Sequence, residues 1–439
     1  MSKIAVVGMG QGGMVAAIKL AEAGYDVTVY EKSARGEVSY EWKDDIRSDV
    51  FEICSLPLPP QSVYCQKCKW VFVSPNLKHR LPVPPCPPLV EISVDRRGLS
   101  EYFVSLAEGA GCKLVFDTAI DSLAIKDSRV VGVAVGGDVK EYDLVIDASG
   151  MRSKLRAHLP KQFGVQAQPK NDGVMYGYRA FFKKVEGAQT VEKGIDATVV
   201  LKHLGSAGVS WCNLNEDGNV DVLIGRVGAL KREDVEAAIK SLKQYNAILS
   251  DELISEKYVE ICVRAAISSC VADGYVAIGD SAYMTMPLMG SGIESSMKAG
   301  KMFADLVLKN NLQDFSAKNM WAFFVRYMRE LGADFALMDT LKRWALALPA
   351  KRIDWLFGSG VISKDDLSVL VTTESEGGKL KIRAKTVFLI LAHPLFLLSA
   401  LRCLLRGYRA MKCAEKIPEN YDVKRVAKWR KKYAKLIRE

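Results

Sequence analysis

The sequence of 439 residues has few of the features that mark secreted or metal-binding proteins. Ten cysteines are too sparse for a disulfide scaffold, so we expect mostly reduced thiols. The chain opens on a predicted strand at 3–7, without a charged and then apolar leader, which predicts a cytoplasmic protein. The few histidines are scattered and suggest no metal cluster; they are His79, His158, His203 and His393.

The C-terminal region has an apolar run that is too short to cross a bilayer. Residues 386–401 are nearly all apolar, but a span needs roughly 20 residues, and His393 and Pro394 interrupt the run. From Leu401 to the end the chain carries 13 Lys or Arg and 4 Asp or Glu, most of the net charge of +10. No recognised nucleic-acid module accompanies these residues, so nucleic-acid binding is disfavoured.

Two interpretations of this region stay open. The first is a helix in the headgroup plane of an anionic membrane, which would place the protein peripherally at the inner face of the membrane. The second is a buried helical hairpin with a solvated basic end. The basic residues that follow the apolar run are Arg402, Arg406, Arg409 and Lys412.

The first part of the chain alternates strand and helix. A strand at 3–7, an amphipathic helix at 13–23 and a strand at 27–31 form a βαβ opening. Nine prolines between Leu56 and Pro88 predict an irregular excursion outside the parallel sheet. A helix at 95–111 and strands near 113–116, 130–135 and 144–146 then rebuild the first domain.

The remaining segments complete the domain organisation. Alternating, aromatic-rich runs predict antiparallel strands at 171–263, whereas a strand at 275–278 and a helix at 292–308 return to the first domain. We therefore expect an α/β protein with a discontinuous Rossmann-type domain at 1–170 and 264–312. An inserted antiparallel substrate domain at 171–263 and a helical C-terminal domain at 313–439 complete the prediction.

The run GMGQGG predicts a dinucleotide site. Gly8 permits a tight turn after the first strand, Gly10 lets the backbone approach a pyrophosphate, and Gly13 lets the helix pack on the sheet. The free N–H groups of the helix N-terminus then face the phosphates. Glu31 ends the second strand, where an acid accepts hydrogen bonds from ribose hydroxyls. This motif alone leaves open which dinucleotide binds.

Two further segments bear on that choice. They are DASGMRSKLR at 147–156 and GDSAYMTMPLMGSGI at 279–293, and Arg96 lies in the intervening run DRRGLSEYFVSLAEGAG. Together these segments resemble the FAD-dependent reductases and monooxygenases related to the aromatic hydroxylases. The resemblance implies a glutathione-reductase-like FAD-binding fold in which all three segments contact one FAD.

The resemblance also implies individual roles. Asp280 would bind the ribityl chain, and Gly290 to Gly292 would head a helix whose N-terminus faces the flavin ring. Such a terminus carries about half a positive charge, which would stabilise the anionic reduced flavin. The other implied FAD contacts are Gly12 and Arg96 near the phosphates, Ala119 near the adenine, and Lys32, Gly150, Pro287, Ser291 and Ile293.

Within this superfamily the chain is similar to the geranylgeranyl reductase family. The run from Ile278 to Leu308 and the downstream RYMRELGADFALMDTLKRWALAL carry the likeness, and Tyr283 stands where hydroxylases usually have His. The chain departs from the family by lacking a cysteine at 36–47. Of the family's aromatic substrate motif only Trp211 carries over; Tyr176 is a second candidate substrate contact, although aromatic side chains at strand spacing more often belong to the core.

Three alternative functions stay open, the first two implied by the resemblance and the third by the basic tail at 423–438. The first is an FAD-dependent oxidoreductase that saturates the prenyl chain of a lipid by hydride transfer, with NAD(P)H or a ferredoxin as electron donor. The second is a monooxygenase acting on an aromatic or quinone substrate. The third is a non-catalytic flavin- or lipid-binding protein at a membrane surface.

Two local features receive less specific interpretations. Cys65 and Cys68, flanked by Cys54 and Cys86, fit reduced structural thiols best, with zinc or a redox pair as alternatives. Asp44 and Asp45, with Glu41 and Trp42, follow the nucleotide motif and either line the mouth of the flavin site or form a solvated turn, and we favour the solvated turn.

Overall fold

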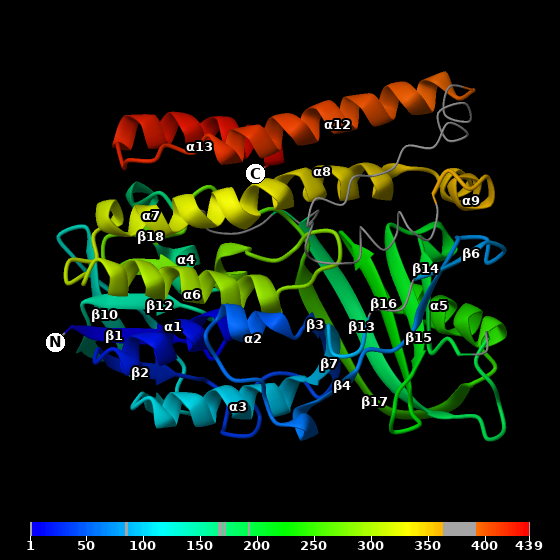
Figure 1. The fold of residues 1–439 in the computed structure, drawn as a ribbon, viewed down its shortest axis with the longest axis horizontal. Coiled ribbons are helices and arrows are strands. Elements are labelled where there is room, and N and C mark those ends of the chain that lie inside the picture. The colour runs from blue at the N-terminus through cyan, green and yellow to red at the C-terminus, as the bar shows by residue number, and fades with distance from the viewer. Residues whose placement is uncertain are drawn as a thin grey trace.

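The computed structural model describes residues 2–83, 87–165, 170, 173–191, 194–362 and 392–438. A six-stranded sheet forms the centre of the N-terminal half (Figure 1). Its strand order is β18 (Val271–Ala272), β19 (Tyr275–Ala277), β12 (Leu144–Asp147), β1 (Lys3–Val7), β2 (Asp26–Tyr30) and β8 (Lys113–Val115). All neighbours except β18 and β19 pair in parallel. These apolar strands are buried on both faces, as parallel strands covered by helices are.

The predicted Rossmann-type architecture is confirmed. The helices of this half are α1 (Gln11–Glu22), α2 (Asp49–Ile53), α3 (Arg96–Gly109), α4 (Lys154–His158) and α6 (Ile293–Lys309). Helix α1 packs against both α3 and α6. Two small sheets flank the core: β9 (Ser122–Lys126), β10 (Arg129–Val135) and β11 (Asp138–Glu141) form one, and β3 (Lys43–Arg47), β7 (Glu91–Asp95) and β4 (Tyr64–Gln66) form the other.

A seven-stranded sheet forms the other half of the molecule. Its order is β17 (Leu249–Cys262), β13 (Val174–Lys184), β16 (Val220–Val227), β15 (Gly208–Leu214), β14 (Ala197–Leu201), β5 (Trp70–Val73) and β6 (Arg80–Pro82). Helix α5 (Arg232–Tyr245) covers one face with a separate apolar core. Strands β5 and β6 come from the proline-rich stretch that the sequence predicted to be irregular. They extend this sheet at its edge, where proline is tolerated, because an edge strand leaves N–H groups unpaired.

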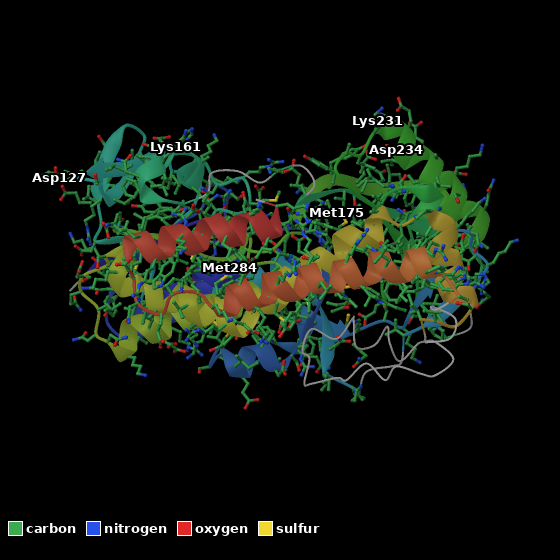
Figure 2. All side chains as sticks on the ribbon, turned by 90° about the horizontal axis from the view of Figure 1, so that it is seen from above. Asp127, Lys161, Met175, Lys231, Asp234 and Met284 are labelled. Carbon is green, nitrogen blue, oxygen red and sulfur yellow. The ribbon has the colours of Figure 1, made fainter. Side chains whose placement is uncertain are left out.

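Helices build the C-terminal region. They are α7 (Ala317–Tyr327), a π-helical turn at Met328–Gly332, α8 (Ala333–Ala347), α9 (Ala350–Gly358), α12 (Pro394–Glu415) and α13 (Val423–Ile437). In Figure 1, α12 and α13 form an outer layer over α7 and α8, and Figure 2 shows α12 and α13 from above. Within the described residues, no helix is both long and apolar enough to cross a bilayer.

The two C-terminal helices differ in how their apolar side chains are placed. Helix α13 buries Val426, Trp429, Tyr433 and Ile437, one residue every three or four, against the main core. The Nε1 of Trp429 also donates to the carbonyl of Cys413 at 2.7 Å. This part is therefore packed as a hairpin. Helix α12 keeps an exposed apolar face, and residues 386–391 of the predicted apolar segment lie outside the described residues.

Candidate functional site

A cavity of about 1680 Å³ joins the two halves of the molecule. Its wall contains the glycine motif at one end and strands β14 and β15 with helices α8 and α9 at the other. Met175 on β13 also lines it and lies near the centre of the molecule (Figure 2). Pockets for a single small molecule commonly measure about 300 to 1,000 Å³. The cavity is therefore large enough for a dinucleotide and a second ligand.

The glycine motif forms the cradle that the sequence predicted. Gly8 has a φ of +87°, and a Cβ there would lie 2.7 Å from the carbonyl oxygen of Ala148. At Gly13 a Cβ would lie 2.4 Å from the Cβ of Ala148, so only glycine lets α1 pack this closely on the sheet. Because α1 begins at Gln11, its free N–H groups open toward the cavity beside Gly10.

Glu31, which follows β2, and Arg96, which begins α3, also line the cavity. The Glu31 carboxylate accepts hydrogen bonds from the backbone N–H groups of Met9 at 2.9 Å and Ser33 at 3.0 Å. Arg96 starts α3, and its Nη1 donates to Asp44 at 3.0 Å. Backbone donors and an ion pair therefore hold this acid and this guanidinium in place before any ligand binds.

Asp147 joins the second and third motifs. This fully buried carboxylate accepts hydrogen bonds from the hydroxyls of Ser149 at 2.6 Å, Tyr275 at 2.6 Å and Ser281 at 3.1 Å, and it also contacts the Ser153 hydroxyl. Such a carboxylate stays buried because several donors replace water. It fixes the loop around Gly150 against the segment that leads to Asp280.

Arg156 reinforces the same junction from the end of the second motif. It is fully buried and donates to the carbonyls of Ser281 and Met151 and to the hydroxyl of Tyr283 at 2.7 Å. Tyr283, which replaces the hydroxylase histidine, is itself fully buried with a φ of +56°. Its role in this structure is therefore to hold the junction.

The third motif presents a helix N-terminus to the cavity. Asp280 follows β19 and accepts a hydrogen bond from the Thr285 hydroxyl at 2.5 Å. Gly290 has a φ of +71°, and α6 begins three residues later at Ile293. The Glu294 carboxylate in the first turn accepts from the backbone N–H of Arg47 at 2.9 Å, which attaches strand β3 to the start of this helix.

The predicted FAD contacts converge on one wall. Gly13 packs behind that wall, and the others line the cavity: Gly8, Gly10, Gly12, Glu31, Lys32, Arg96, Ala119, Gly150, Asp280, Pro287, Gly290, Ser291, Gly292 and Ile293. Two helix N-termini, an acid beside the glycine turn and an arginine form a set that fits the phosphates, ribose and ring of FAD. The assignment of each residue to a part of FAD stays a prediction.

A charged cluster that the sequence did not reveal lies further along the wall. Arg179 on β13 is 6% exposed and donates to Asp221 at 2.7 Å and to Asp44 at 3.0 Å. Its guanidinium also lies over the rings of Trp42 and Trp211, 4.8 Å and 5.4 Å from their centroids. No local pattern marks this cluster, because its members come from strands distant in sequence.

Asp45 forms a second part of this cluster. Its carboxyl contacts the Ser93 hydroxyl and lies 3.9 Å from the ammonium of Lys67, which is closer to Glu91 at 2.9 Å. Burial raises the pKa of the Asp45 carboxyl above its usual range. The interpretation of Asp44 and Asp45 as a solvated turn is therefore wrong, because both lie on β3 and line the cavity.

The opposite end of the cavity is apolar. Strands β5 and β14 and helix α9 supply a small core of their own around Phe72, Val199 and Phe357. The side chains that line this end include Leu201, Val209, Met289, Trp344, Ala345, Leu348, Ile353, Leu356 and Ile362. The cavity therefore runs from polar groups at the nucleotide motifs to an apolar end beneath α8 and α9.

The two candidate substrate contacts differ in their positions. Trp211 on β15 lines the cavity beside Arg179. Tyr176 is not among the described residues of the wall; its neighbour Met175 is, and Tyr176 packs against the main core. Since successive residues of a strand face opposite sides, this position argues against contact between Tyr176 and a molecule in the cavity.

Cys54, Cys65 and Cys68 are free thiols. Cys54 is buried in the main core, whereas Cys65 and Cys68 line the cavity. Burial raises the pKa of Cys65 to about 11 and that of Cys68 to about 12, so both thiols are protonated at neutral pH. Within the described part of the chain, no three His, Cys, Asp or Glu side chains gather into a metal site; Cys86 lies outside it.

Comparisons with known proteins agree with this geometry. The profile of the NAD(P)-binding Rossmann-like domain matches residues 6–46. Digeranylgeranylglycerophospholipid reductase 2 of Methanopyrus kandleri is 25% identical over 357 residues, 76% of this chain and 83% of the relative. These findings support an FAD-dependent oxidoreductase that is similar to the geranylgeranyl reductase family.

A further relative and a solved structure extend the comparison. Menaquinone reductase of Mycolicibacterium smegmatis is 24% identical over 371 residues, 78% of this chain and 85% of the relative. The crystal structure of a geranylgeranyl bacteriochlorophyll reductase-like protein from Thermoplasma acidophilum has a TM-score of 0.73 at 16% identity. The alignment covers 92% of this chain and 99% of that one, so the two proteins share their fold.

Proposed function

We propose that this protein saturates carbon–carbon double bonds in the prenyl chain of a lipid. The observation that supports this substrate most strongly is the apolar end of the cavity, which continues from the polar nucleotide end and is lined by Trp344, Leu356 and Phe357. The relatives named for prenylated glycerophospholipid and menaquinone reduction support the same class of substrate. A site that binds the prenyl tail, whatever headgroup carries it, accounts for the names of both relatives.

The residues of the chain divide the work of this reaction. Bound FAD, once reduced by NAD(P)H or a ferredoxin, supplies the hydride. With FAD bound as proposed, the N-terminus of α6 would lie near the ring, and its partial positive charge would stabilise the reduced anion. Trp344 and its apolar neighbours hold the prenyl chain and exclude water from it. Arg179, fixed by Asp44 and Asp221, closes the polar side of the cavity.

The function is tested by anaerobic reoxidation of the reduced protein. Protein reduced with dithionite is mixed with a geranylgeranyl lipid or with oxygenated buffer, and the flavin absorbance is followed. We expect the oxidised flavin spectrum to return when the lipid is added in the absence of oxygen. Recovery only with oxygen, together with hydroxylation of an aromatic substrate, would support the monooxygenase alternative and contradict a prenyl reductase.

We further propose that α12 places the protein on an anionic membrane, the source of such a lipid. One face of α12 packs on α8, and the opposite face exposes apolar side chains that are each more than 40% exposed. Arg402 and Arg409 are exposed on the same side, which suits anionic headgroups. The exposed apolar side chains are Leu395, Leu398, Leu401, Leu404, Leu405 and Tyr408.

Vesicle binding tests this orientation. Replacing Arg402 and Arg409 by Gln together should weaken binding to vesicles rich in anionic lipid roughly 30-fold, because each basic residue near such a surface contributes about 1 kcal/mol. The control replaces Arg232 and Lys240 by Gln; these lie on α5, in the other half of the molecule (Figure 1). Equal losses in both pairs would contradict α12 as the contact surface.

A further inference from the structure

Asp45 shares its nearest cation with a second carboxylate. Its Oδ2 lies 3.9 Å from the Lys67 ammonium, whereas an oxygen of Glu91 lies 2.9 Å from the same ammonium. Its Oδ1 contacts the hydroxyl of Ser93 on β7. Asp45 therefore faces a cation that is already paired, and its remaining exposed surface, 21% of the side chain, belongs to the cavity wall.

The charges of the surrounding network balance when Asp45 is neutral. Asp44 pairs with Arg96 and Arg179, and Arg179 also pairs with Asp221. This group is balanced with two acids and two cations, whereas beside it Asp45 and Glu91 share the single cation of Lys67, and an uncompensated buried charge is costly. Burial raises the pKa of the Asp45 carboxyl in agreement with this count. The charged members are Asp44, Asp45, Glu91, Asp221, Lys67, Arg96 and Arg179.

Asp45 also lies on the strand that connects the start of α6 with the Arg179 cluster. Strand β3 is attached at Arg47 to the first turn of α6 through Glu294, and at Asp44 to Arg179, whose guanidinium lies over the ring of Trp211. Asp45 lies between these two attachments and faces the cavity. If a prenyl chain occupies the apolar end of the cavity, a double bond that reaches the flavin end lies beside this stretch of the wall.

We propose that Asp45 is the proton donor for reduction of the prenyl double bond, an inference that depends on the proposed function. In the step, the carbon–carbon π bond breaks and one carbon takes a hydride from the reduced flavin, which is oxidised by two electrons. The other carbon takes the proton of Asp45, whose O–H bond breaks and leaves a carboxylate.

Neighbouring groups support both states of this carboxyl. Ser93 fixes its orientation by contact with Oδ1, and Lys67 stabilises the carboxylate that remains after transfer. Water that enters the cavity between turnovers returns the proton. Cys68, which lies near Asp45 and has a pKa of about 12, stays a neutral thiol and adds no competing charge.

The protonation of Asp45 is measured without turnover. Infrared spectra of the oxidised protein at neutral pH should contain a protonated-carboxyl band that disappears in Asp45→Asn. The same band should persist in Asp196→Asn, which removes another cavity carboxyl, one that accepts from the backbone N–H of Lys69 at 3.1 Å. A band of unchanged intensity in Asp45→Asn would overturn the proposal.

The transfer itself is measured as anaerobic reoxidation of the reduced protein by a geranylgeranyl lipid. A well-placed general acid contributes about 10²- to 10⁴-fold, so Asp45→Asn should slow lipid-driven reoxidation at least 100-fold. FAD affinity and reduction by dithionite should not change. Asp45→Glu, which restores an acid, should recover part of the rate.

Two outcomes separate this proposal from the proposed function. A loss of rate in Lys342→Gln with no loss in Asp45→Asn would assign the proton to the buried Lys342, whose pKa burial lowers, and would overturn the role of Asp45. If the unaltered protein forms no saturated lipid, the proposed function fails. The infrared measurement then still decides whether Asp45 holds a proton.

Discussion

Gly10→Val protein is expected to bind FAD at least 100-fold more weakly than the unaltered protein, a loss of about 3 kcal/mol. A Cβ at Gly10 would lie 2.8 Å from the carbonyl oxygen of Ala148, and the added methyl groups would occupy the space through which the backbone approaches a pyrophosphate. The measurement is titration of FAD-free protein with FAD, followed by flavin fluorescence.

A matched glycine replacement separates this effect from general destabilisation. Gly109 ends α3, and a Cβ there would meet no atom within 4 Å. Gly109→Ala should therefore keep the FAD affinity of the unaltered protein. Circular dichroism of both variants checks that the fold is intact, and a folded Gly10→Val protein with normal FAD affinity would contradict the assigned pyrophosphate site.

Narrowing the apolar end of the cavity should discriminate between prenyl substrates of different length. Ala345 on α8 lines this end, and Ala345→Trp should slow reoxidation by a geranylgeranyl lipid at least tenfold, about 1.4 kcal/mol, since overpacking typically costs 1–3 kcal/mol. A short isoprenoid that does not reach α8 should reoxidise the flavin at nearly the original rate.

The control for this prediction lies two residues away. Ala347 is on the same helix but exposed, and it is not among the described residues of the cavity wall. Ala347→Trp should leave both rates unchanged. Equal slowing of long and short substrates by Ala345→Trp would contradict a tail site at this end of the cavity.

The sequence predicted the parts of the structure that depend on local patterns. The glycine turn at Gly8 and the strand and helix around it follow from φ restrictions and hydrophobic spacing, which a short window contains. The same holds for the helix that begins at Ile293 after Gly290. These elements carry the predicted nucleotide end of the cavity.

The sequence could not predict contacts set by distant pairing. Arg179 meets Asp44 and Asp221 only because strands from different parts of the chain converge, at separations of 135 and 42 residues. The pairing of β13 in the sheet likewise decides which face of the strand meets the cavity, and this face carries Met175 and not Tyr176. The prolines near β6 suggested an irregular segment because an edge position is not visible in the local pattern.

The central claim, reduction of a prenyl chain at this cavity, is tested most directly by product analysis. Reduced protein is incubated with one equivalent of a geranylgeranyl lipid under strict exclusion of oxygen, and the extracted lipid is examined by mass spectrometry. The account predicts a lipid that has gained two hydrogens for each flavin oxidised. A lipid recovered unchanged from protein whose FAD is fully reduced would contradict it.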